Sequence, residues 1–152
     1  MFQVSALPYA PFAALFSLDD AALARRRARR VVAGPADPCR VSLADAAPGE
    51  TLLLLHHVHQ PADTPFRASH AIYVREHAVQ AYPAPGEMPP ALARRTLSLR
   101  AFDSAGELIA GDLAEGGEAA PTIAALFADR VVAYLHAHYA RFGCYAARID
   151  RV

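Results

Sequence analysis

The chain contains no lysine, and all 15 of its basic residues are arginine. These arginines are matched by 15 acidic residues, so the formal net charge is zero. Proteins that attract nucleic acid or an acidic membrane through their overall charge carry a basic excess. The balanced charge therefore argues against a nucleic-acid partner and against a membrane partner.

Cysteine is also scarce. Cys39 and Cys144 lie far apart, and neither belongs to a Cys-x-x-Cys pair. This spacing argues against a disulfide scaffold and against a cysteine zinc knuckle, so we expect reduced thiols. No apolar run approaches the length of a membrane span, and residues 1–5 provide no basic leader before such a run. We expect a cytoplasmic protein.

The overall composition is typical of a packed globular protein. Apolar residues make up 54% of the 152 positions and charged residues make up 20%. A chain of this length buries a substantial core and has the size of one ordinary domain. We therefore expect a single globular domain that spans residues 1–152.

Two segments have helical patterns. Ser17 and Asp20 form a capping-box pattern that predicts a helix from there to about Arg30. Five arginines crowd this segment, and we interpret them as a solvated surface because no aromatic residues are interleaved with them. Pro121 occupies a position typical of a helix first turn and predicts a second helix to about Ala128.

Between the helices the chain has strand-like patterns. The predicted strands span residues 39–43, 51–59, 69–76, 96–102 and 107–113. The run 51–59 begins with continuous apolar residues, which predicts a strand in the sheet interior. The prolines of segment 82–90 predict an irregular loop. These patterns predict an α+β fold: a mainly antiparallel, curved β-sheet packed by two helices, with a closing C-terminal β-hairpin.

The final hairpin concentrates chemically active side chains. A three-residue loop over 141–143 would place Gly143 in the left-handed conformation of a type I hairpin turn. That register pairs Ala140 with Cys144, His138 with Ala146, and His136 with Arg148. One face is then apolar, and the other carries Tyr134, His136, His138, Cys144, Arg148 and Asp150.

Three interpretations of this polar face stay open. In the first, Cys144 is a catalytic nucleophile, His138 is its base, His136 is a second acid, and Arg148 holds an anionic group. In the second, the histidines bind a metal. In the third, the face supports the fold or contacts a protein partner, without chemistry of its own.

The metal interpretation has a further pair of candidates. His57 and His59 share one face of the strand predicted at 51–59, just as His136 and His138 share a face of the hairpin. The segment from Gly49 to His59 is similar to the first motif of cupin barrels, but the second cupin motif is missing. A four-histidine site requires the two strands to pair.

Four segments of the chain carry a family resemblance. They are residues 38–43 (PCRVSL), 59–61 (HQP), 64–69 (TPFRAS), and the C-terminal stretch with HAH at 136–138 and GCYAARI at 143–149. With these segments the chain resembles bacterial proteins classed as domain of unknown function 1203. The family motif matches His59, Gln60, Arg67, Ser69, His136, His138, Cys144, Tyr145 and Arg148. The resemblance implies one complete domain from Phe2 to Arg151, and it argues against a ligand role for His57, which lies outside the motif.

The resemblance and the residue chemistry together favour binding of a small anionic molecule on the polar face of the hairpin. Arg67 lies in a loop before a strand, where it could join Arg148 as an anion clamp. The matched motif adds His59, Ser69 and Tyr145 as ligand-binding candidates. A non-catalytic interaction module and a histidine-ligated metal protein are the alternatives. The sequence identifies no cofactor, and a homo-oligomer stays open.

Overall fold

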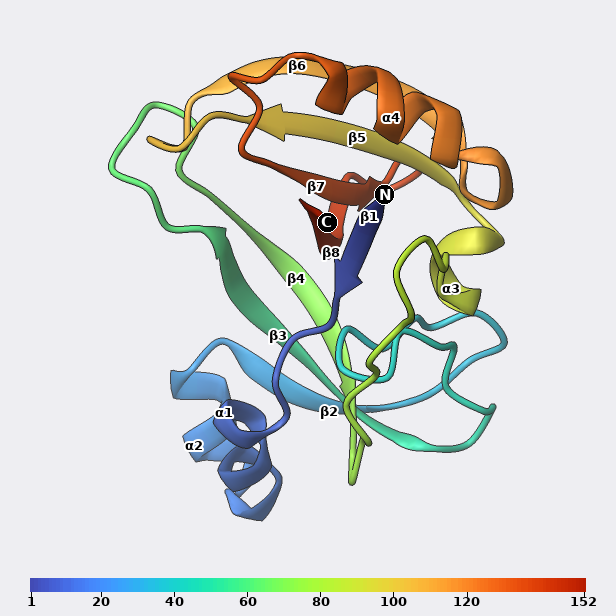
Figure 1. Cartoon of the computed structure of the whole chain (residues 1–152). Helices are drawn as coiled ribbons and strands as arrows, with labels where there is room; N and C mark the ends of the chain where they lie inside the picture. Colours follow the sequence, from blue (N-terminus) through green and yellow to red (C-terminus); the bar gives the residue numbers. More distant parts are fainter.

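The computed structural model describes all 152 residues and contains two antiparallel sheets with four short α-helices (Figure 1). The five-stranded sheet has the order β1-β8-β7-β5-β6, and the three-stranded sheet has the order β2-β3-β4. The strands are β1 (Phe2–Ser5), β2 (Ala28–Val32), β3 (Thr51–Gln60), β4 (Ala68–Arg75), β5 (Thr96–Phe102), β6 (Leu108–Glu115), β7 (Tyr134–Tyr139) and β8 (Cys144–Arg151). The helices are α1 (Ala10–Ala13), α2 (Asp20–Arg25), α3 (Pro90–Ala93) and α4 (Ala120–Ala128).

The predicted α+β class, the antiparallel strand pairing and the closing C-terminal hairpin β7–β8 are confirmed. The strands form two sheets instead of one, and four helices pack on them instead of two. The chain passes from one sheet to the other twice, between β1 and β2 and again between β4 and β5. The second connection contains the predicted proline-rich loop.

One face of the five-stranded sheet builds the larger apolar core. Alternate residues of β5, β7 and β8 point to this face, where α4 covers them. The fully buried side chains include Leu97, Leu99, Leu135 and Ile149 from the strands and Ile123 from α4. Burying each such side chain contributes about 1.5–3 kcal/mol. The opposite face of the same strands carries polar residues.

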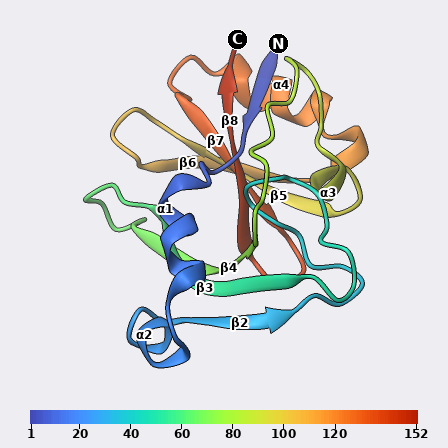
Figure 2. The ribbon, with the colours of Figure 1, turned by 90° about the horizontal axis from the view of Figure 1, so that it is seen from below.

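The three-stranded sheet has its own core. Phe12 of α1 and Leu23 of α2 pack with Leu53 of β3 and with Ile72 and Val74 of β4. Figure 2 shows α1 and α2 beside β2 and β3. The strand predicted at 51–59 is the central strand β3 of this sheet, so its prediction as an interior strand is confirmed.

The helix predicted from Ser17 to Arg30 is wrong at both ends. The N-cap is Asp19, whose carboxylate accepts a hydrogen bond from the backbone of Ala22 at 2.7 Å. The helix α2 ends at Arg25, and Arg27 then adopts a left-handed conformation with φ of 54°. The remaining residues form strand β2, which pairs with β3 along its whole length. Long-range pairing therefore overrides a local sequence of good helix formers.

The strand predicted at 39–43 is also absent. Cys39 makes only an isolated bridge to Tyr73, and the chain then turns, with the amide of Leu43 bonded to the carbonyl of Cys39 at 3.0 Å. The Cys39 sulfur accepts weak hydrogen bonds from nearby backbone amides, which holds this turn in place. The other predicted strands match β4, β5 and β6 within two residues, and α4 matches the predicted second helix.

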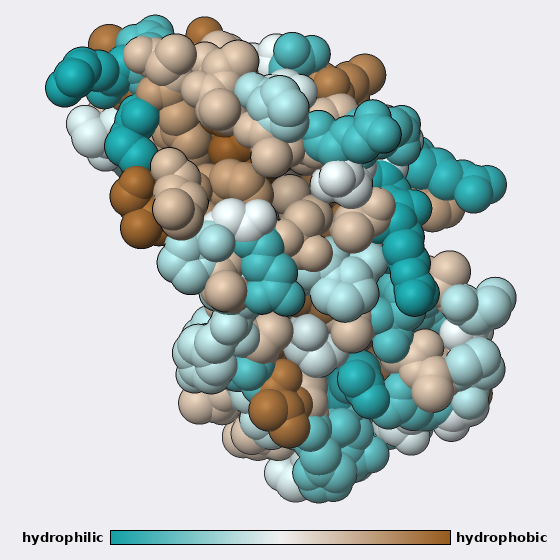
Figure 3. Space-filling view, turned by 45° about the vertical axis from the view of Figure 1, so that its right-hand side comes forward, coloured by the Kyte–Doolittle hydropathy of each residue, from teal (hydrophilic) through white to brown (hydrophobic).

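The molecular surface differs between the two parts of the molecule. On the face shown in Figure 3, apolar side chains gather over the part that contains the five-stranded sheet, and hydrophilic side chains predominate over the other part. None of the helices combines the length and apolarity that crossing a bilayer requires.

Candidate functional site

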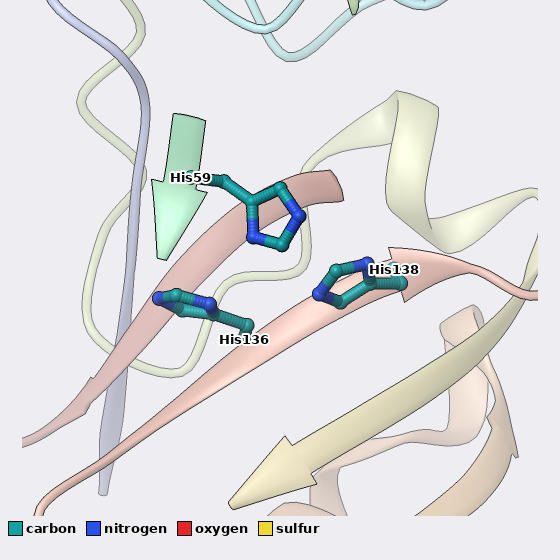
Figure 4. A group of neighbouring side chains, drawn as sticks. All are labelled: His59, His136 and His138. Carbon is teal, nitrogen blue, oxygen red and sulfur yellow. The ribbon is translucent and has the colours of Figure 1, made fainter. Parts of the chain in front are cut away.

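Three histidine rings from the two sheets meet in the interior (Figure 4). His136 and His138 are two residues apart on β7, so both side chains leave the polar face of the five-stranded sheet. His59 reaches toward them from the end of β3. One ring nitrogen of each histidine lies within 4.8 Å of the other two, and no carboxylate or thiol joins the group. This set is called the histidine triad below.

A β-bulge explains the position of His59. Val58 pairs with Ser69 and Gln60 pairs with Ala68, so His59 is an extra residue with no partner on β4. A bulge bends the strand and redirects its side chain. The ring of His59 is thereby directed toward β7.

His57 does not join the triad. Strands β3 and β7 belong to different sheets, so the pairing that a four-histidine site required does not occur. His57 pairs with His70 on β4, and its ring lies 6.2 Å from that of Tyr145. Three of the four candidate imidazoles therefore come together without strand pairing.

Aromatic rings hold the triad in place. The ring of Tyr145 stacks on that of His59 with centroids 5.2 Å apart and planes 8° from parallel. The His59 ring meets the His138 ring edge-on at 4.9 Å. On the other side, the ring of Phe102 lies 5.0 Å from His136. These contacts restrict rotation of all three imidazoles.

The triad nitrogens lack protein partners. Nδ1 of His59, Nδ1 of His136 and Nε2 of His138 are buried and make no hydrogen bond. Nδ1 of His138 lies 3.0 Å from the carbonyl oxygen of Gly143. A carbonyl can only accept, so this nitrogen carries the proton and Nε2 keeps a free lone pair. Metal-binding histidines are commonly fixed in one tautomer by such a bond.

The imidazoles are neutral at ordinary pH. His136 is 4% exposed and His138 is fully buried. Burial, reinforced by nearby positive groups, lowers the pKa of His136 and that of His138 to about 3. Burial also lowers the pKa of the less buried His59 to about 4. Neutral imidazoles are the form that binds metal ions.

Two arginines flank the triad. Arg100 of β5 and Arg148 of β8 lie opposite His136 on either side of β7, so the three side chains form a row across the sheet. Arg148 forms an ion pair with Asp150 at 2.8 Å and lies 3.9 Å above the ring of Tyr134. Arg100 has no ion pair, and burial lowers its pKa. Arg100 is therefore an unpaired positive charge beside the triad, whereas the charge of Arg148 is balanced by Asp150.

A small cavity opens beside the triad. It has a volume of about 320 Å³ and borders His59, His136 and Arg148. At its edge, buried Gln60 donates a hydrogen bond to the hydroxyl of Tyr134 at 2.9 Å. Gly106, in the turn between β5 and β6, approaches this edge so closely that a Cβ there would collide with Ala62. The cavity therefore lies next to two of the three histidines.

The register of the β7–β8 hairpin differs from the prediction. The loop has four residues, so Tyr139 pairs with Cys144 and His138 pairs with Tyr145. The predicted pairing of Cys144 with Ala140 is therefore wrong, and so is that of His138 with Ala146. A bulge then restores the predicted pairing of His136 with Arg148, which is confirmed. Gly143 has the predicted left-handed conformation, with φ of 74°.

This register exchanges two side chains between the faces of the hairpin. Tyr145, predicted on the apolar face, lies among the histidines. Cys144, predicted on the polar face, packs in the apolar core with Tyr139 and is 9% exposed. The structure therefore does not assemble a nucleophile pair from Cys144 and His138.

Two further candidate residues, Arg67 and Ser69, lie at the surface. Arg67 is exposed and donates to the carbonyl of Pro61. It does not border the cavity at Arg148, and it forms no ion pair with Asp63 or Glu76. Ser69 is exposed on β4. The anion clamp predicted from two arginines is therefore not formed by Arg67.

Sequence reasoning did not identify Arg100 as a site residue. The alternation of β5 places it opposite the buried Leu97 and Leu99, which predicts a polar face. That alternation could not show that β7 is the neighbouring strand. The second arginine beside the histidines is therefore Arg100, where the sequence predicted Arg67.

The fold and the site define a small α+β protein with a histidine triad between two antiparallel sheets. Residues 36–151 match the family model described as "Protein of unknown function (DUF1203)", and the chain belongs to this family. The matched segment contains all three histidines and both flanking arginines. No curated protein and no solved structure matches the chain.

Proposed function

We propose that this protein binds a divalent transition-metal ion through His59, His136 and His138 and presents it to a small anionic ligand. The observation that carries this proposal is the convergence of three imidazoles, each of which has a buried ring nitrogen without a hydrogen-bond partner. Buried polar groups are nearly always paired, and leaving one unpaired costs about 1–3 kcal/mol. A metal ion would satisfy all three at once.

The donor set indicates the kind of metal. Neutral imidazoles suit zinc, copper, nickel and iron, whereas calcium and magnesium prefer oxygen ligands. No carboxylate belongs to the triad. The proposed ion is therefore zinc or another first-row transition metal.

The spacing of the nitrogens is compatible with coordination. Zinc lies about 2.0–2.1 Å from imidazole nitrogens, which places nitrogens about 3.4 Å apart in a tetrahedral site. The triad nitrogens lie within 4.8 Å of one another, so coordination would require the rings to move closer together. His59 is the ring with most freedom to move, because it is less buried than the two on β7.

Three protein ligands leave a coordination position open. Structural zinc sites have four protein ligands, whereas catalytic sites have three and an open position. The cavity beside His59 and His136 lies on the side where a fourth ligand would bind, and Arg148 borders it. A metal ion there would supply Lewis acidity to a bound oxygen group. The metal charge and the flanking arginines favour an anionic ligand.

Titration with Co²⁺ tests the site directly. Chelator-treated protein is titrated while the visible absorption of cobalt is followed, since nitrogen ligation in a low-symmetry site intensifies it. We expect saturation at about one ion per chain, as for a single three-histidine site. The variants His136→Ala and His138→Ala should each lose this saturable absorption.

His70→Ala is the matched control. His70 is a partly exposed histidine on β4 that lies outside the triad, so its replacement should leave the cobalt absorption unchanged. Equal cobalt binding by wild type and both β7 variants would disprove the site.

A further inference from the structure

A second, larger cavity lies away from the triad, at the turn between β7 and β8. It has a volume of about 830 Å³ and extends to residues 36–40, the middle of β3 and β4, and the end of α3. Its lining includes Arg40, Tyr73, Arg95, Tyr139, Arg141 and Phe142. It is called the Arg40 cavity here. A volume of this size accommodates a small organic molecule.

The charge of the cavity is not balanced. Three arginines line it, against the single carboxylate of Asp37. That carboxylate accepts a hydrogen bond from the backbone of Gly34 at 2.7 Å. Arg95 is neutralised by Asp45, which lies 2.8 Å away. Arg141 is exposed to solvent, which screens its charge.

Arg40 is the exceptional residue. Its side chain is among the largest that are fully buried, and the residue is 1% exposed. It has no ion pair, and its hydrogen bonds run from Nε to the carbonyl of Tyr145 at 2.7 Å and from Nη1 to the carbonyl of Pro38. A buried guanidinium normally has an anionic partner, because removing it from water costs several kcal/mol. No group of the protein supplies that anion.

Tyr139 adds an unpaired donor to the same wall. Its ring lies between two guanidiniums, 5.0 Å from Arg40 and 5.1 Å from Arg95. Its hydroxyl is buried and makes no hydrogen bond. Burial raises the pKa of Tyr139 to about 12, so the hydroxyl keeps its proton at neutral pH and can donate it to an anion.

The rest of the lining is mainly apolar, with His70 and Thr96 as the polar exceptions. Leu54, Ala71 and Phe142 border the cavity together with the ring of Tyr73. An occupant therefore needs an anionic end for Arg40 and Tyr139 and an apolar body for this wall. One unpaired buried cation matches a single negative charge, which favours a carboxylate over a dianionic phosphate.

We infer that the Arg40 cavity binds a small organic carboxylate with an apolar body, held by Arg40 and the hydroxyl of Tyr139. This binding site is separate from the histidine triad, because Tyr139 leaves the face of β7 opposite to that of His136 and His138. Its occupation does not depend on a metal ion.

Nuclear magnetic resonance titration of chelator-treated, ¹⁵N-labelled protein with sodium benzoate tests this inference. We expect saturable shifts of the amide signals of Arg40, Ala71 and Cys144. Neutral benzamide has the same ring and shape, so it should cause no saturable shift. Saturable binding by benzamide, or by inorganic phosphate in place of benzoate, would overturn the assignment, and so would the absence of benzoate binding.

Three variants make the test specific. Arg40→Met should abolish benzoate binding, and Arg29→Met, at an exposed arginine of β2, should leave it unchanged. Tyr139→Phe removes one hydrogen bond to a charged group, so it should weaken binding about tenfold. If Arg40→Met does not fold, Tyr139→Phe decides the question. Unchanged benzoate affinity in Tyr139→Phe would refute the site.

Discussion

Acidification of the metal-free protein should destabilise its folded state through the triad. His136 and His138 are buried as neutral imidazoles, and burial lowers the pKa of each to about 3. In the unfolded chain the pKa returns to its ordinary value of about 6.5. Below that value the unfolded state binds more protons than the folded state, so stability falls as the pH falls.

The size of this loss of stability depends mainly on the pKa of histidine in the unfolded chain. Between about pH 7 and about pH 5.5, each buried histidine lowers the stability of the folded state by about 1.25 kcal/mol, and the two together lower it by about 2.5 kcal/mol. The folded-state pKa values lie well below this window, so both imidazoles stay neutral in the folded protein throughout it. His59, whose pKa is also lowered well below this window, should contribute a loss of similar size. A loss of this size is a large share of the 5–15 kcal/mol typical of a domain.

Urea unfolding of chelator-treated protein at the two pH values measures this loss. The double variant His136→Gln, His138→Gln cannot titrate at these positions, so its stability should fall by about 2.5 kcal/mol less than that of wild type. His56→Gln, at an exposed position of β3, should retain the pH dependence of wild type. If the double variant and wild type lose equal stability, the two imidazoles are not buried as neutral groups.

Two further predictions concern packing around the site. Gly106→Ala should destabilise the protein by about 2–3 kcal/mol in urea unfolding, because its φ is +87° and the new methyl group meets Ala62. Gly49→Ala, where φ is +90° and nothing lies within 4 Å, should cost only the backbone strain of about 1 kcal/mol; equal losses would contradict the close approach. Cys144 should react with a thiol reagent more slowly than free cysteine, because it is buried in the core. Faster reaction would restore the nucleophile hypothesis.

The strands with strong local patterns could be predicted from the sequence. Residues 96–102 alternate between apolar and polar side chains, and β5 occupies the predicted range. The continuous apolar run that opens the predicted strand 51–59 correctly indicated the interior strand β3. In both segments the local pattern and the tertiary environment agree, which is why local reasoning succeeds there.

Strand β2 could not be predicted in this way. Its first three residues, an alanine and two arginines, favour a helix, and their pairing with β3 overrides this preference. The left-handed turn at Arg27 that separates it from α2 has no glycine to mark it. A local sequence pattern does not show which distant segment will pair with a strand.

Only part of the candidate site could be predicted from the sequence, and the reason is similar. The spacing of His136 and His138 places them on one face of a strand, and the structure shows this arrangement. Their meeting with His59 depends on a bulge and on the packing of one sheet against the other, which have no local sequence pattern. The exchange of Cys144 and Tyr145 has the same origin, because the hairpin combines a longer loop with a compensating bulge.

The most direct test of the central claim is elemental analysis of tag-free protein purified without chelators, beside the His136→Ala, His138→Ala double variant prepared identically. We expect about one transition-metal ion per chain in the wild type, as in other three-histidine sites, and loss of that metal in the variant. A wild type that contains no stoichiometric metal and takes up none from added Zn²⁺ or Co²⁺, or a variant that retains the same metal content, would contradict the account.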